Sequence, residues 1–392
     1  MTDTTPRDVA PMPPYLGALT PLRGIAAVTM VAYHFNMFVM PVIDPAVTRL
    51  HQHGYLLVDF FFILSGFILS HVYGGWFEVG APRERLRRYM RARFARVYPL
   101  HLTTLLWVVG IYLLVVVVYA AKLPPGARSV FDPWAIPLHL LMLHGLSTAP
   151  GGTWNTPSWS VGTEWLVYLA FPFLTLAFRR LATWGKLGLL VGVFGAYAYL
   201  TTPLSTDPPI RPWLPNVPYT IAEISFPNSS VRCFAGFVLG MVTHFAFSRG
   251  WGLRWLARDA AVLALVGGLL AGCHLHVPDM VTVWLLPLLI LGACHNRGRT
   301  ARALGTAPLR SLGEWSYSIY MVHMPIIFSF LGAQLIAEGA REDAAKPITY
   351  GLVGPASALA FVVLVVLVSA LTYRVIEAPA RRYLSPSGRA PR

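Results

Sequence analysis

Charged residues are scarce in this sequence. They make up 12% of the 392 residues, while 55% are hydrophobic and the mean hydropathy is +0.56. A soluble domain carries roughly 25% charged residues. No polar stretch of fifty residues or more is present either, so we expect a single membrane domain over 17–382 between polar tails at 1–16 and 383–392.

Cysteine is also scarce, and its placement gives no sign of a metal site. Cys233, Cys273 and Cys294 all fall in apolar stretches with no CxxC spacing, which is typical of small core residues. We therefore expect no metal. A cleavable signal peptide is not predicted, because the first apolar run is about 23 residues long and no A-x-A site follows it. That run is interpreted as a retained first helix.

Long apolar runs predict an all-α transmembrane bundle. A helix needs about 20 apolar residues to span a bilayer, and ten runs come near that length: 17–39, 55–73, 98–120, 159–178, 186–202, 230–247, 256–273, 277–294, 311–331 and 352–374. The stretch 132–145 is shorter and interrupted by Pro137, so we expect an interfacial or re-entrant helix there.

The basic residues predict the orientation of these spans. With ten spans and both termini in the cytoplasm, 23 of the 31 Lys and Arg residues lie on the cytoplasmic side and 6 on the outer side. Cytoplasmic loops of membrane proteins are rich in these residues. The split therefore accounts for most of the +14 charge without a nucleic-acid partner. A proline-rich loop at 203–229 would lie outside, as a surface loop or a cover for a site.

Ionisable residues inside apolar spans are costly and are candidate functional groups. Arg23 and His34 are eleven residues apart in the first span, about 16 Å along one helix face. Asp59 could orient His34, cap a helix end or pair with an arginine, and Glu164 could also orient His34. The other such residues lie in later spans: Arg232 and His323.

Seven arginines lie within 83–96, just before the third predicted span. Guanidinium groups suit phosphate, so the run could bind a nucleotide-like donor. Its charge is also explained by topology and anionic lipid headgroups. The buried ionisable groups likewise fit either an enzyme with acid–base chemistry or a proton-coupled transporter. A scaffold for polysaccharide assembly would not need them.

Six motifs occur in one order along the chain: R-x10-H at Arg23 and His34, D-x-F-F-x-x-S-G-F at 59–67, R-x-R-x-x-R-x-x-P-L at 91–100, W-S-x-x-x-E-W at 159–165, S-Y-S-I-Y-x-x-H-x-P at 316–325, and E-x-P at 377–379. In these motifs the sequence resembles the acyltransferase 3 family of bacterial membrane proteins. The resemblance runs from about 19 to 382. Thr20 stands where many members have Asp, and Gly162 where Ser is common.

The resemblance implies an O-acyltransferase of the bacterial inner membrane. The expected donor is acyl-CoA, in the first instance acetyl-CoA, and the expected acceptor is a hydroxyl of a cell-surface or secreted carbohydrate or a lipid-linked glycan. Polysaccharide-assembly partners are conceivable. In this reading His34 is the general base or an acyl carrier, Arg23 anchors negative charge, and His323 is a second candidate base. The CoA phosphates would be held by Arg91, Arg93 and Arg96.

Overall fold

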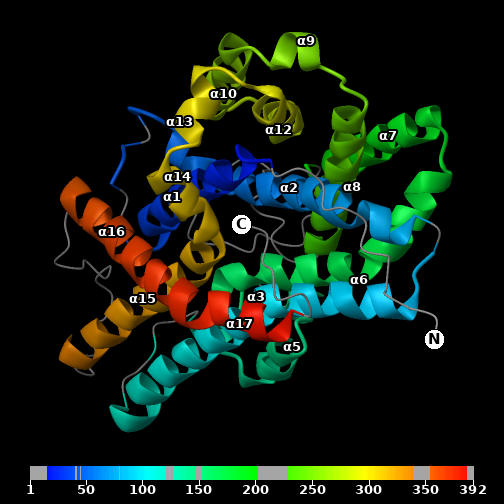
Figure 1. Ribbon diagram of the computed structural model, residues 1–392. Coiled ribbons are helices and arrows are strands. Elements are labelled where there is room, and N and C mark those ends of the chain that lie inside the picture. The colour runs from blue at the N-terminus through cyan, green and yellow to red at the C-terminus, as the bar shows by residue number, and fades with distance from the viewer. Residues whose placement is uncertain are drawn as a thin grey trace.

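The computed structural model describes residues 16–39, 42–44, 46–78, 80–120, 123, 127–146, 152–201, 228–338 and 354–385. Nearly all of the proline-rich loop 203–229 lies outside these ranges, as do most of the two predicted tails. Every regular element of the described residues is helical, which agrees with the predicted all-α class (Figure 1).

The longer helices are α1 (Leu19–Phe38), α2 (Leu56–Tyr73), α3 (Arg83–Tyr112), α6 (Trp159–Arg180), α7 (Thr183–Leu200), α8 (Ser229–Ser248), α10 (Asp259–His274), α12 (Leu285–His295), α15 (Ser316–Glu338) and α16 (Pro355–Thr372). The shorter ones are α4 (Ala127–Val130), α5 (Ile136–Leu140), α9 (Leu253–Leu256), α11 (Asp279–Thr282), α13 (Arg299–Leu304), α14 (Ala307–Glu314) and α17 (Ala378–Leu384). Single 3-10 turns occupy Leu50–Gln52, Gly74–Phe77, Pro133–Ala135, His144–Leu146 and Thr156–Ser158, and π-helical turns occupy Leu113–Val118 and Tyr373–Glu377.

Six helical stretches of the described residues are long and apolar enough to cross a membrane: Leu56–Phe77, Arg83–Val118, Thr156–Arg180, Ser229–Ser248, Ser316–Ala337 and Pro355–Leu384. The other four predicted spans also fall on helices, namely α1, α7, α10, and α11 with α12. The chain is thus a helical membrane protein, while the total of ten spans and the cytoplasmic termini remain predictions.

The third helix differs from the prediction. We expected a span at 98–120 preceded by an arginine-rich segment, but α3 begins at Arg83 and includes the whole arginine run. No glycine or proline lies between Arg83 and Tyr98, and arginine is a good helix former. Helical geometry therefore decides which of these arginines face the protein interior.

The segment around 132–145 does not form a span. It consists of the turn Pro133–Ala135, the five-residue helix α5 and the turn His144–Leu146. Five helical residues rise only about 7.5 Å, far less than the hydrocarbon thickness. No helix long enough to span forms here, in agreement with the expectation, and the interfacial or re-entrant placement stays a prediction.

Among the described helices, α2 and α8 pack against each other most extensively. A Cβ atom at Gly66 would lie 2.0 Å from the carbonyl oxygen of Phe237, and one at Gly240 would lie 2.0 Å from that of Ile63. Only glycine allows this backbone contact. The absence of a side chain at Gly66 and Gly240 therefore brings the two helix backbones into direct contact.

Candidate active site

A cavity of about 130 Å³ lies among five helices, α1, α2, α3, α6 and α15. Its wall is apolar where α2 contributes Phe61, Phe62 and Leu64. The remaining wall is strongly polar and includes Arg23, Ser65, Arg93, Arg96, Ser160, Glu164, Tyr168, Ser316, Tyr317 and Tyr320. Residues from the first, second, third, fourth and fifth sequence motifs therefore meet around one space.

Three guanidinium groups face this cavity. Arg93 donates from Nη2 to the Tyr73 hydroxyl at 2.9 Å, and its Nε is buried with no hydrogen-bond partner among the described residues. Arg96 forms an ion pair with the buried Glu377. Arg23 makes no hydrogen bond or ion pair to another described residue. Part of this positive charge is therefore uncompensated and available to an anion.

Arg91 does not join this group. Its side chain is exposed, and it does not line the cavity. Successive residues of an α-helix are rotated by 100°, so Arg91 points about 160° away from Arg93 and about 140° away from Arg96. The expectation that these three arginines act together is corrected by the geometry of α3.

His34 and His323 lie in direct contact. The Nδ1 atom of His34 is 2.8 Å from Nε2 of His323, and the two rings are nearly parallel, with centroids 4.9 Å apart and planes 7° apart. His323 is fully buried. It lies on the same face of α15 as the cavity residues Ser316 and Tyr320, and its ring is 5.9 Å from that of Tyr320.

The hydrogen bonds of this pair select its tautomer. The carbonyl oxygen of Ile319, 3.3 Å from Nδ1 of His323, can only accept, so that nitrogen carries the proton. Nε2 of neutral His323 is then an acceptor and takes the proton of His34 Nδ1. Nε2 of His34 consequently holds a lone pair and can accept a proton.

Asp59 lies in a separate buried cluster. Arg232 donates to both of its carboxylate oxygens, at 3.0 and 2.6 Å, and the Tyr197 hydroxyl donates at 3.0 Å. Both charged side chains have 0% exposure. Of the roles left open for Asp59, pairing with an arginine is the one that the structure has. His323, rather than Asp59, is the residue in contact with His34.

Glu164 has a different setting. It is half-buried at the cavity wall and interacts with Tyr168, one turn further along α6. This carboxylate is the one acidic group among the residues that line the cavity. It therefore shares the cavity wall with the guanidinium groups of α1 and α3.

Comparison with known proteins identifies the family to which the chain belongs. The family model of the acyltransferase domain, acyltransferase 3, matches residues 17–374. The chain belongs to the acyltransferase 3 family. The matched range contains every helix that lines the cavity and both histidines of the His34–His323 pair. This protein is therefore a membrane acyltransferase, and the alternative class of transporter is not supported.

Two of the individual relatives are themselves named as acyltransferases. Acyltransferase MdmB of Streptomyces mycarofaciens is 28% identical over 389 residues, which cover 95% of this chain and 94% of the relative. The peptidoglycan O-acetyltransferase OatA of Listeria monocytogenes is 23% identical over 354 residues, 80% of this chain and 49% of the relative. Protein 2 in the picA locus of Rhizobium radiobacter is 31% identical over 155 residues, 37% of this acyltransferase and 75% of that protein. No solved structure matches.

Proposed function

We propose that this acyltransferase moves an acyl group, in the first instance acetyl, from acyl-CoA to a hydroxyl of a carbohydrate or lipid-linked glycan in the bacterial inner membrane. The observation that carries the proposal is the cavity itself. Arg23, Arg93 and Arg96 line it together with Tyr320, whose ring is 5.9 Å from that of His323, the partner of His34. The positive charge suits an anionic donor, and the neighbouring histidine pair suits a proton acceptor.

The donor end of the cavity is the arginine cluster. Guanidinium groups bind phosphate oxygens through charge-assisted hydrogen bonds, and Arg93 has a buried N–H with no partner among the described residues. Arg23 lies about 16 Å from His34 along α1 and on the same face, because eleven residues make three turns. This separation suits a donor whose phosphates and acyl carbon are held by different groups.

The His34–His323 pair supplies the general base. The acceptor hydroxyl gives its proton to Nε2 of His34 while its oxygen bonds to the thioester carbon. The carbon–sulfur bond then breaks, and the CoA thiolate takes up the proton from His34. His323 is a positioning residue in this scheme, since it fixes the tautomer and orientation of His34. A transient acyl group on His34 is the rival route.

The acceptor class is proposed from the relatives and the site together. One relative is named as an O-acetyltransferase of peptidoglycan, a carbohydrate polymer. The cavity also offers the hydroxyls of Ser65, Ser160 and Ser316 and the carboxylate of Glu164, which are suitable partners for sugar hydroxyls.

The test is release of free CoA by purified protein in lipid, with acetyl-CoA and a panel of glycan acceptors. We expect His34→Ala to reduce the rate by 10²-fold or more, as loss of a general base does, with donor binding near that of the wild type. Arg93→Gln should raise KM for acetyl-CoA about tenfold or more, because a hydrogen bond to a charged group contributes roughly 1.5–3 kcal/mol.

Arg91→Gln is the matched control. It removes the same charge from the same helix but from an exposed side chain, and we expect an unchanged KM. Full activity of His34→Ala would remove His34 from the mechanism. Equal effects of the two arginine variants would contradict donor binding at the cavity. If the wild type released no CoA with any acceptor, the acyl-CoA donor would be wrong.

A further inference from the structure

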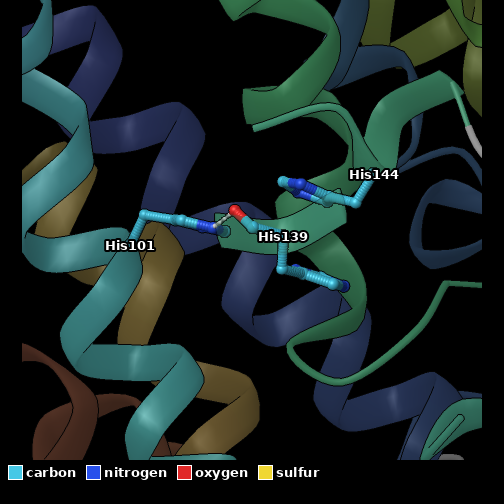
Figure 2. Close-up of side chains that lie close together, drawn as sticks. All are labelled: His101, His139 and His144. Carbon is cyan, nitrogen blue, oxygen red and sulfur yellow. Dashed lines mark hydrogen bonds between the residues drawn. The ribbon is translucent and has the colours of Figure 1, made fainter. Parts of the chain in front are cut away.

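Three buried histidines lie together outside the cavity. His101 is on α3, His139 is on α5, and His144 begins the following turn, and their side chains are 1%, 0% and 3% exposed. Figure 2 shows the three imidazoles lying close together between α3 and the α5 segment. One ring nitrogen from each lies within 4.8 Å of the others, and the described residues contain no second group of this kind.

The hydrogen bonds fix which nitrogen is protonated in two of the three rings, those of His101 and His144. Nε2 of His101 is 3.0 Å from the carbonyl oxygen of His139, and Nε2 of His144 is 2.8 Å from that of Ser158. Carbonyl oxygens only accept, so both Nε2 atoms are donors. Nε2 of His139 lies 2.9 Å from the hydroxyl of Thr153, which can accept in the same way.

The other nitrogens are unsatisfied. Nδ1 of His101, of His139 and of His144 are all buried, with no hydrogen-bond partner among the described residues. Leaving one buried polar atom unpaired costs about 1–3 kcal/mol, and here three acceptors of the same kind are left within one cluster. A histidine that binds a metal typically donates its other N–H to a carbonyl or similar acceptor, as His101 and His144 do.

We propose that His101, His139 and His144 bind one divalent transition-metal ion of the Zn²⁺ class through Nδ1. Three neutral imidazoles without a carboxylate suit zinc rather than Mg²⁺ or Ca²⁺. With Zn–N distances of about 2.0–2.1 Å, tetrahedral ligands stand roughly 3.3 Å apart. The near-parallel rings, 8–13° between planes, therefore turn and close inward on binding, and water completes the site.

The ion would hold the segment 136–146 against the helices of the active site. Gly145 packs against α6, where a Cβ atom would lie 2.5 Å from the backbone nitrogen of Thr163, next to Glu164. Its carbonyl accepts a hydrogen bond of 2.6 Å from Ser229 on α8. His101 lies five residues after Arg96 on α3. The site thus links elements that carry the cavity, without contributing a group to it.

The test is the zinc content of the full chain, purified without a polyhistidine tag, stripped with EDTA and dialysed against zinc. We expect about one zinc ion per chain, and absorption of a tetrahedral cobalt complex when Co²⁺ replaces zinc. His101→Gln and His139→Gln should each weaken zinc binding tenfold or more. His244→Gln is the control, because it removes a half-buried histidine of the α2·α8 pair, 5.4 Å from the ring of His71.

A second measurement guards against variants that fold poorly. Zinc should raise the Tm of the stripped wild type, since a ligand that binds only the folded state stabilises it. It should raise the Tm of His244→Gln equally and leave that of His139→Gln unchanged. The proposal is overturned if the wild type binds no zinc, or if a variant lacking all three histidines binds as much. Neither result depends on the acyl-transfer proposal.

Discussion

At the scale of the residue, the ionisable groups within the helices divide into two kinds. Arg23, Arg93 and Arg96 face a cavity, where a ligand can reach them. Asp59 and Arg232 are fully buried and bonded to each other, and Arg232 also donates to the carbonyl of Tyr55. An ionisable residue within a predicted span therefore belongs either to a ligand site or to a structural ion pair. The residues that it contacts show which of the two applies.

This distinction predicts the behaviour of Asp59. Asp59→Leu leaves Arg232 buried without its partner, which typically costs about 3–5 kcal/mol, so Tm in detergent should fall sharply. The double variant Asp59→Leu/Arg232→Met should recover most of that loss, because a well-packed apolar pair can replace a buried ion pair. A single variant with wild-type Tm but no acyl transfer would instead assign Asp59 a role in catalysis.

At the scale of the element, helix α3 combines two parts with different surroundings. Its first half carries the arginines, and its second half is the apolar part of the stretch Arg83–Val118. Because the helix is continuous, the 100° rotation per residue carries Arg93 and Arg96 to the cavity and Arg91 away from it. Helix α3 therefore carries the arginine run at one end, and its rotation decides that Arg93 and Arg96, but not Arg91, line the cavity.

The α2·α8 pair gives a prediction about helix packing. Gly66→Ala places a methyl carbon 2.0 Å from the carbonyl oxygen of Phe237, so the helices must separate. Overpacking of this kind costs roughly 1–3 kcal/mol, and a lower Tm is expected. Gly188→Ala on α7 is the control, since nothing lies within 4 Å of its added carbon and alanine is the better helix former. Equal Tm values would show that the α2·α8 contact does not limit stability.

At the scale of the whole molecule, the helices surround the cavity while the arginine run lies at one end of α3. Topology predicts that this end faces the cytoplasm, where CoA is found. Single cysteines can test it in a background without Cys233, Cys273 and Cys294. In intact cells an impermeant maleimide should label Arg211→Cys and miss Arg88→Cys, which should react only after permeabilisation. External labelling of Arg88→Cys would reverse the predicted orientation.

Composition and periodicity along the chain were enough to predict an all-helical membrane protein, the position of most of its helices, and which charges within the spans needed an explanation. These features depend on local composition and periodicity. The sequence was also enough to predict that Arg91 and Arg93 point in nearly opposite directions, because this follows from rotation along one helix. The motif residues of α1, α2, α3, α6 and α15 were recognised individually before the structure brought them to one cavity.

Only the tertiary structure decided which side chains meet. His34 contacts His323 across 289 positions, and Asp59 pairs with Arg232 across 173. The histidines at 101, 139 and 144 come together because α3 packs beside a short broken segment that no periodicity marks. Periodicity fixes which face of a helix a residue occupies, but the crossing of helices distant in sequence decides what that face touches, and it depends on packing over the whole molecule.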